Sequence, residues 1–96
     1  MVVEQLSFRV RRGREADFEK DRQALHAALR RAQGFVTLAW YRGVENAAEQ
    51  VAEIRWASRD YRDRFAATDD KETVALRARI AERLEAPPAA RLLEPI

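Results

Sequence analysis

The chain of 96 residues is 47% hydrophobic and 35% charged, with a formal net charge of +2, a composition that predicts one globular domain over residues 1–96 and excludes a disordered chain. It has no cysteine, which excludes disulfides, thiolate metal sites and cysteine nucleophiles. No apolar run approaches the roughly 20 residues of a membrane span and the N-terminus does not resemble a signal peptide, so we expect a cytoplasmic protein that does not contact a membrane.

The N-terminal residues predict a strand followed by a helix. Leu6, Phe8 and Val10 alternate with polar residues, which is the period of a strand with one buried face. After a short turn, residues 14–32 predict a helix, because acidic residues lie in its first turn and apolar residues recur at helical spacing. Gly34 lies where a left-handed C-terminal cap of this helix is expected.

The middle of the chain predicts two strands joined by a hairpin. The second strand, residues 35–44, is apolar or aromatic on both of its faces, and Trp40 and Tyr41 point to opposite sides of it. The third strand follows over residues 49–56.

The C-terminal part predicts a helix in two pieces and a last strand. Ser58 can cap a short helix over residues 58–67. Asp69 and Glu72 have the spacing of a capping box for the next helix, whose apolar stripe consists of Val74, Leu76, Ile80 and Leu84. Two prolines end this helix, and residues 89–96 predict the last strand.

This order of elements is the βαββαβ pattern of ferredoxin-like α+β folds, with a four-stranded antiparallel sheet. The helices cover one face of such a sheet, whereas the apolar residues on both faces of the second strand predict that the other face is covered as well. The chain has no further element to cover it. We therefore expect a homodimer in which two sheets pack face to face around a shared interior.

Four stretches of the sequence resemble one family. They are the basic-Gly turn after the first strand, Gly34-Phe35, Ile54-Arg55-Trp56-Ala57-Ser58 at the end of the third strand, and Arg91-Leu92-Leu93-Glu94-Pro95. Together they resemble the antibiotic biosynthesis monooxygenase family of dimeric α+β barrels, over essentially the whole chain. The most specific element is the tryptophan and serine two residues apart at the strand end.

The resemblance implies several activities, because the family includes cofactor-independent quinol and polyketide monooxygenases, haem-degrading enzymes, isomerases and members without an established reaction. The haem-degrading branch has an asparagine on the first strand and a histidine about ten residues after the tryptophan. Here these positions hold Leu6, beside Gln5, and Ala66. Haem degradation is therefore not expected, since that chemistry requires an axial ligand.

The polyketide-quinol branch implies oxygenation without metal or flavin. Its substrate, once deprotonated, reacts with oxygen directly, and the protein supplies a dry cavity, a hydrogen bond to the developing oxyanion and a base. The tryptophan carries over to Trp56. In one type of these enzymes an asparagine precedes it by four residues and a tyrosine follows it by six; those positions here hold Ala52 and Arg62, with Tyr61 next to the latter.

Four aromatic residues are candidates for the site, with Trp56 and Tyr61 in catalytic roles. Trp56 can donate its indole N–H to a substrate oxygen or pack at the seam between strand and helix, and the two roles are compatible. Tyr61 and Phe65 share one face of the short helix, as a packed pair or as part of a pocket wall. Trp40 is a binding candidate, with core or dimer packing as the alternative.

Arg55 and His26 complete the binding candidates. Arg55 shares a strand face with Glu53, so it can pair with that carboxylate, with a partner subunit or with an anionic substrate. His26 is the only histidine, the residue type most often used as a base near neutral pH; the alternative is a partly exposed helix residue without a catalytic role. One histidine without cysteine cannot build a protein metal site of the usual ligand number, so we expect no metal and no cofactor.

The sequence thus leaves two functions open. The first is oxygenation of a quinol-like or polyphenolic small molecule in a pocket of a homodimeric barrel, and the second is a ligand-binding or structural barrel without catalysis. A cavity with convergent polar groups would favour the first, and a cavity filled by aromatic rings the second. A nucleic-acid-binding module is excluded, because the third strand lacks the basic-Gly-aromatic run of RNA-recognition domains.

Overall fold

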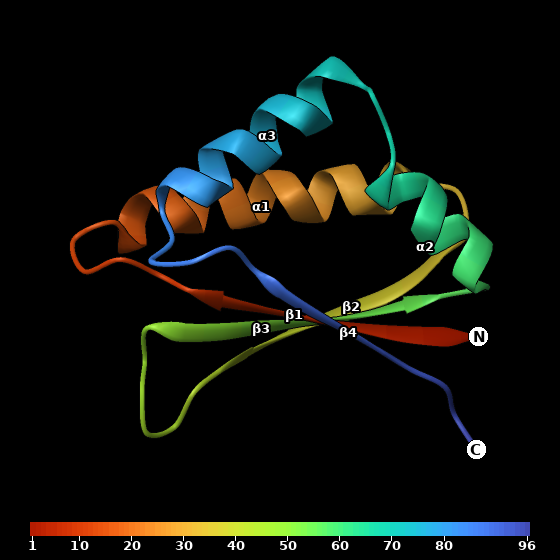
Figure 1. Cartoon of the computed structure of the whole chain (residues 1–96), viewed down its shortest axis with the longest axis horizontal. Coiled ribbons are helices and arrows are strands. Elements are labelled where there is room, and N and C mark those ends of the chain that lie inside the picture. The colour runs from red at the N-terminus through yellow and green to blue at the C-terminus, as the bar shows by residue number, and fades with distance from the viewer.

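A four-stranded antiparallel sheet carries three helices on one face in the computed structural model, which describes residues 1–96 (Figure 1). The strands are β1 (Val2–Arg9), β2 (Phe35–Arg42), β3 (Glu49–Trp56) and β4 (Ala89–Leu93), and the helices are α1 (Glu15–Arg31), α2 (Arg59–Ala66) and α3 (Lys71–Glu82). The strands lie in the order β2-β3-β1-β4. This is the predicted ferredoxin-like α+β fold, although β2 and β4 end earlier than predicted.

The alternation of residues along β1 decides which side chains face the helices. Phe8 and Val10 are buried and Leu6 is half-buried on this face, as predicted. Glu4 has the same parity and is only 6% exposed. A carboxylate therefore lies among the apolar side chains on the helix side of the sheet, where an ionised group needs partners.

Helix α1 packs on the sheet through the predicted apolar stripe, with Phe18, Leu25 and Leu29 buried. The buried face of α1 also includes Asp21, whose carboxylate accepts hydrogen bonds from Arg79 Nε at 3.5 Å and Arg83 Nε at 3.0 Å. Arg79 lies in α3 and Arg83 directly follows it, so this carboxylate connects α1 to α3. The buried charge is tolerated because it has two cationic partners.

Gly34 reverses the chain between α1 and β2. Its φ of +83° is the predicted left-handed conformation, but the cap of α1 is Ala32, two residues earlier, with extended backbone. A Cβ at this position would lie 2.1 Å from Cγ of Tyr61. Glycine is thus required both for the backbone conformation and for the close approach of the tyrosine ring.

The start of α3 differs from the prediction by one residue. The cap is Asp70, whose carboxylate accepts hydrogen bonds from the backbone N–H of Thr73 at 3.1 Å and from its hydroxyl at 2.9 Å. The predicted capping box of Asp69 and Glu72 is therefore wrong. Thr73 faces the core and is 7% exposed, whereas Val74, predicted in the apolar stripe, is 49% exposed.

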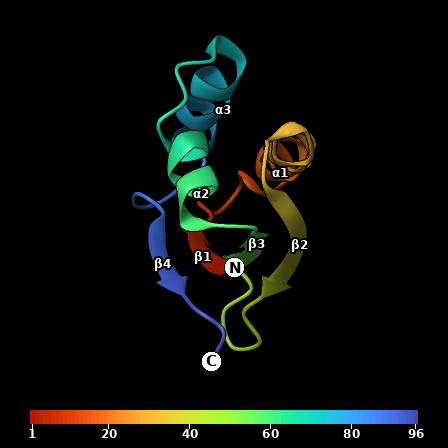
Figure 2. The same ribbon diagram turned by 90° about the vertical axis from the view of Figure 1, so that its right-hand side faces the viewer.

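The second face of the sheet has no helix over it. Figure 2 shows α1 above the β2 side of the curved sheet and α2 and α3 above its β4 side, with no helix below. We call this second surface the open face. Its strand pairing places together Val3, Ala39, Tyr41, Val51 and Leu93, along with Gln5, Glu53, Arg55 and Arg91. None of the helices is long and apolar enough to cross a membrane.

Candidate functional site

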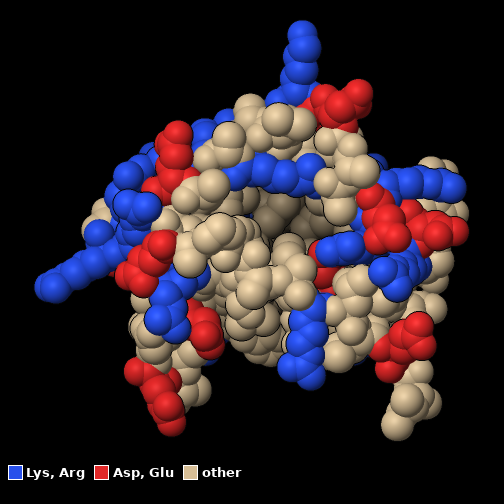
Figure 3. Space-filling model, in the orientation of Figure 1, with Lys and Arg blue, Asp and Glu red and all other residues tan.

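A cavity of about 330 Å³ lies between the sheet and the helices. Its lining comes from β1, β3, all three helices and the segment before β4: Glu4, Leu6, Phe8, Leu25, Leu29, Ile54, Arg62, Phe65, Ala66, Arg77, Ile80 and Pro88. Figure 3 shows a hollow between the helices and the sheet, with Lys and Arg side chains at its rim. A mostly apolar wall with a few charged groups is the usual composition of a small-molecule site.

The polar part of the cavity is organised around Glu4. The indole Nε1 of Trp56 donates to Glu4 Oε1 at 3.1 Å, and Nε of Arg62 donates to Glu4 Oε2 at 2.9 Å. Arg62 also donates to Oδ1 of Asp63 at 3.2 Å. Burial acts to lower the pKa of Arg62, but the hydrogen bonds and charges of Glu4 and Asp63 outweigh it and raise the pKa. The guanidinium of Arg62 therefore stays protonated at the cavity wall, where it is paired with Glu4.

Trp56 lies behind this pair and does not line the cavity. Its side chain is fully buried, with ring centroids 6.3 Å from Phe35 and 5.6 Å from Phe65. This is the packing predicted for the seam between β3 and α2. Because the indole N–H is bonded to Glu4, Trp56 orients that carboxylate, and the cavity wall in front of it is formed by Phe65.

Arg77 extends from α3 to the same cavity. It donates a hydrogen bond to the backbone carbonyl of Phe65, and its guanidinium lies 5.2 Å from the centroid of the Phe65 ring. Burial lowers the pKa of Arg77, and the negative charge of Glu4 offsets part of this effect. Arg77 is thus a partly desolvated cation beside the apolar wall.

The other aromatic candidates lie outside the cavity. Tyr61 packs against Gly34, with the guanidinium of Arg64 at 5.5 Å from its ring. Trp40 packs in the core at 5.7 Å from Phe8, and its buried Nε1 has no hydrogen-bond partner. Neither residue lines the cavity, and their predicted site roles stay predictions.

Arg55 and His26 are also placed away from the cavity. Arg55 lies on the open face, where its guanidinium is 3.6 Å from a carboxylate oxygen of Glu53, the ion pair predicted as one alternative. His26 is half-buried on α1, and it does not line the cavity although the preceding Leu25 does. Of the six predicted site residues, the structure brings Phe65 to the cavity wall and Trp56 to the carboxylate behind it.

The three charged residues of the cavity, Glu4, Arg62 and Arg77, were not identified as functional groups from the sequence. Arg62 was noted only as the residue at a family tyrosine position, and Glu4 and Arg77 were not noted. One signal was available for Glu4: an acidic residue with the same parity as Leu6 and Phe8 on a strand with one buried face. No cluster of three or more His, Cys, Asp or Glu side chains that could hold a metal ion is present.

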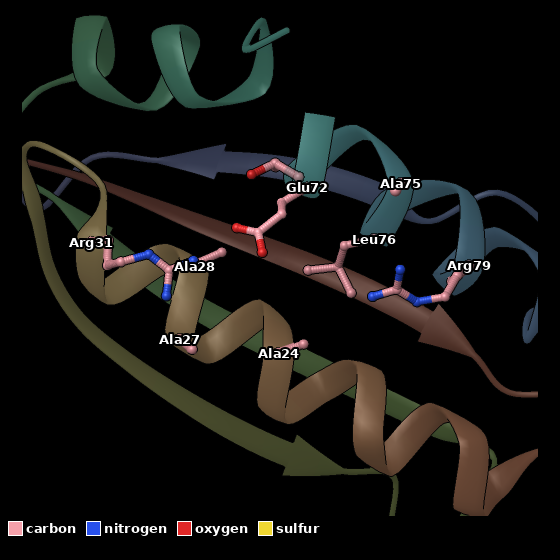
Figure 4. A pocket seen from close by; sticks show the side chains of 9 residues that line it. Ala24, Ala27, Ala28, Arg31, Glu72, Ala75, Leu76 and Arg79 are labelled. Carbon is pink, nitrogen blue, oxygen red and sulfur yellow. The ribbon is translucent and has the colours of Figure 1, made fainter. Parts of the chain in front are cut away.

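A second depression lies outside, between α1 and α3 (Figure 4). Its floor is formed by small side chains because Ala24, Ala27 and Ala28 of α1 face Ala75 and Leu76 of α3. The labelled side chains of Arg31 and Glu72 reach into it from opposite helices, and Arg79 closes its other end. It has no buried charged group comparable to Glu4, so the cavity under the helices is the better candidate site.

Comparisons with known proteins agree with the fold. The sequence pattern of a family described as antibiotic biosynthesis monooxygenase matches residues 1–85. No curated protein sequence matches the chain.

Three solved structures illustrate the likeness. Rv0793 from Mycobacterium tuberculosis is 22% identical with a TM-score of 0.85, over 99% of this chain and 94% of that one. SnoaB from Streptomyces nogalater, a cofactor-independent oxygenase, is 21% identical with a TM-score of 0.85, over 98% and 91%. The monooxygenase of the gene ActVA-Orf6 of Streptomyces coelicolor, in complex with nanaomycin D, is 19% identical with a TM-score of 0.77, over 99% and 87%.

At these identities the solved structures establish the shared fold, whereas the family pattern extends over most of the sequence. Because it matches residues 1–85 of the 96, this chain belongs to the antibiotic biosynthesis monooxygenase family.

Proposed function

We propose that the chain is a cofactor-independent monooxygenase that oxidises a quinol-like or polyphenolic small molecule in the cavity under the helices. The observation that carries the proposal is the Glu4–Arg62 pair, with Glu4 buried and Arg62 half-buried, at the polar end of a mostly apolar cavity. Membership of the family supports it, as does the likeness to a cofactor-independent oxygenase and to a monooxygenase that binds nanaomycin D.

The proposed reaction converts a phenol with a free ring C–H, plus one dioxygen, into a quinone plus water. The phenol first loses its hydroxyl proton, and the electron-rich phenolate transfers an electron to dioxygen. The resulting pair forms a bond between the ring carbon and oxygen. The proton on that carbon then leaves as the O–O bond breaks, so that one oxygen becomes the new carbonyl and the other leaves in water.

Glu4 and Arg62 are the groups of this chain that can bind the reacting end of the substrate. A carboxylate has about four acceptor sites, and two hydrogen bonds to Glu4 occur in the structure. Glu4 therefore retains the capacity to accept a hydrogen bond from a substrate hydroxyl. The Arg62 cation beside it offsets the negative charge of Glu4, so that a phenolate can form next to this pair.

Trp56 and Phe65 support this arrangement. Trp56 is a positioning residue, since its N–H fixes Oε1 of Glu4 while Arg62 holds Oε2. Phe65 offers the face of its ring to an aromatic substrate from α2. The apolar residues of β1, β3 and α1 exclude water from the reactive intermediate.

Oxygen uptake by the metal-free protein tests the proposal, with a panel of quinols and hydroxylated naphthalenes. Glu4→Gln keeps the shape of the side chain but removes the charge, so we expect kcat/KM to fall about tenfold or more. The matched control is Glu19→Gln, which weakens a half-buried pair with Arg22 on α1, away from the cavity, and is expected to leave the rate unchanged. Equal loss in both variants would reject the role of Glu4, and ligand binding without uptake on any substrate would favour a binding protein.

We further propose that a second copy of the chain covers the open face, giving a dimeric α+β barrel. The open face combines apolar side chains with a paired Glu53 and Arg55, and Arg91 lies on the edge strand β4, where the polar rim of an interface is expected. Light scattering should give twice the mass of the chain for the wild type and for Val74→Arg, which adds the charge on the solvent side of α3. Val51→Arg on the central strand should give a monomer. A monomeric wild type at micromolar concentration would reject the dimer.

A further inference from the structure

The half-buried arginines of this chain are paired with carboxylates, with one exception. The pairs are Arg14–Asp17, Arg22–Glu19, Arg55–Glu53, Arg62–Glu4 and Arg83–Asp21, at N–O distances of 2.5 to 3.6 Å. Arg77 is the remaining half-buried arginine, and its one hydrogen bond goes to a backbone carbonyl. It also lines the cavity. Arg77 is therefore the half-buried arginine without a carboxylate partner, and it faces the candidate site.

The surroundings of Arg77 fix its position without neutralising it. A guanidinium has five N–H donors, and only the carbonyl of Phe65 accepts from it. The Phe65 ring below the guanidinium, at 5.2 Å, holds it in place. Burial lowers the pKa of this group, which means that its charged form is less favourable here than in water. An anion in the cavity would relieve this cost.

We propose that Arg77 recognises a carboxylate on an aromatic ligand whose rings occupy the apolar part of the cavity. This inference rests on the proposed function for the ring chemistry, because both use the same cavity. Glu4 is already neutralised by Arg62, so Arg77 leaves the cavity with one net positive charge, which matches one carboxylate. The planar guanidinium can bind a carboxylate through two parallel hydrogen bonds.

The size of the cavity limits the rest of the ligand. Its volume of about 330 Å³ lies near the lower end of the roughly 300–1,000 Å³ of small-molecule sites. We therefore assign a hydroxylated aromatic acid with one or two rings as the substrate class. The hydroxyl faces Glu4 and Arg62, and the acid group faces Arg77.

A matched pair of ligands tests this specificity by calorimetry, without turnover. The probes are 4-hydroxy-2-naphthoate, whose hydroxyl and carboxylate cannot bond to each other, and its neutral amide, 4-hydroxy-2-naphthamide. Wild type should bind the acid at least about tenfold more tightly than the amide, which corresponds to about 1.4 kcal/mol. Arg77→Gln should bring this ratio to about one with the amide affinity kept, and Arg77→Lys should retain part of it.

Arg64→Gln is the matched control, because Arg64 is also stacked on an aromatic ring, that of Tyr61 at 5.5 Å, but does not line the cavity. It should keep the wild-type ratio. A wild-type ratio near one, or an unchanged ratio in Arg77→Gln, overturns the inference. If Arg77→Gln does not fold, the wild-type preference for the acid must weaken at high salt; a preference that does not change with salt also overturns it.

The outcomes for the two proposals are separable. An acid preference that depends on Arg77, without oxygen uptake, supports this inference and rejects oxygenation. Oxygen uptake on neutral polyphenols without any acid preference supports oxygenation and rejects the role of Arg77.

Discussion

The two tryptophans make opposite predictions for the same substitution. The indole N–H of Trp56 donates to the buried carboxylate of Glu4 at 3.1 Å, whereas that of Trp40 is buried without a partner. A hydrogen bond to a charged group contributes about 1.5–3 kcal/mol, and a buried donor without a partner costs about 1–3 kcal/mol. Replacement by Phe removes a favourable hydrogen bond at Trp56, whereas at Trp40 it removes a buried N–H donor that has no partner.

The smaller ring loses packing at both sites, by about 1 kcal/mol. We therefore expect Trp56→Phe to lower the free energy of unfolding by about 2.5–4 kcal/mol, and Trp40→Phe to leave it unchanged or raise it by up to about 2 kcal/mol. The measurement is urea unfolding followed by far-UV circular dichroism, because tryptophan fluorescence differs between the variants. Protein concentration is held constant, since association of the chain would contribute to the apparent stability.

A double-mutant cycle isolates the contact itself. If Trp56 acts through Glu4, the loss caused by Trp56→Phe should be smaller by about 1.5 kcal/mol or more in a Glu4→Ala background. Losses that add without coupling, or a Trp40→Phe variant as unstable as Trp56→Phe, would refute the reasoning from hydrogen-bond partners.

Two further predictions concern the loop and the helix cap. Gly34→Ala should destabilise the protein more than Gly13→Ala. Both positions have positive φ, which costs about 1–2 kcal/mol for alanine, but only Gly34 lies against Tyr61, whose displacement adds about 1–3 kcal/mol. Equal losses of stability in thermal unfolding would argue against the close approach of Tyr61 to Gly34. The hydrogen bonds from Thr73 lower the pKa of Asp70 below its ordinary value of 3.8, so its ionised form stabilises the fold above about pH 4 and this contribution is lost as the pH falls through the lowered pKa. Asp70→Asn, which can still cap α3, should therefore weaken the dependence of the free energy of unfolding on pH between about 4 and 2. The same pH dependence in the variant as in the wild type would contradict this.

The strands were predictable because burial on one face of a sheet imposes a period of two. Leu6, Phe8 and Val10 have that period, and the structure places all three on the helix side. The ends of the strands were less predictable. The apolar side chain of Val44 extended the predicted second strand, yet it lies in the hairpin and is fully exposed, since the alternation cannot show where pairing with the next strand stops.

The start of α3 could not be decided from the sequence, since Asp69 and Asp70 are both suitable caps. An aspartate at either position can accept hydrogen bonds from the free backbone N–H groups of the first turn. In the structure Thr73 is buried and Val74 is exposed, and Asp70 caps the helix by accepting hydrogen bonds from this buried threonine. Packing on α1 and the sheet, rather than helix propensity, therefore selects the cap.

The site was predictable only in part, because its central contacts join residues far apart in the chain. Trp56 was identified through the family resemblance, but its partner Glu4 lies 52 positions away, and Arg62 lies 58 positions from the same carboxylate. No spacing rule links such residues. What brings them together is the pairing of Glu4 with Ile54 in neighbouring strands, which places the end of β3 and the first turns of α2 beside one carboxylate.

The departure of this chain from the family pattern at Arg62 is explained by that same carboxylate. An arginine alone at this half-buried position would place an uncompensated cation in an apolar cavity, and Glu4 alone would place an uncompensated anion there. Together they form a pair at 2.9 Å and supply both an acceptor and a positive field to one end of the cavity. On the proposed function, this polar end would bind a phenol through a carboxylate and a guanidinium rather than through neutral hydroxyl and amide groups, so we expect the protein to select its substrate by acidity.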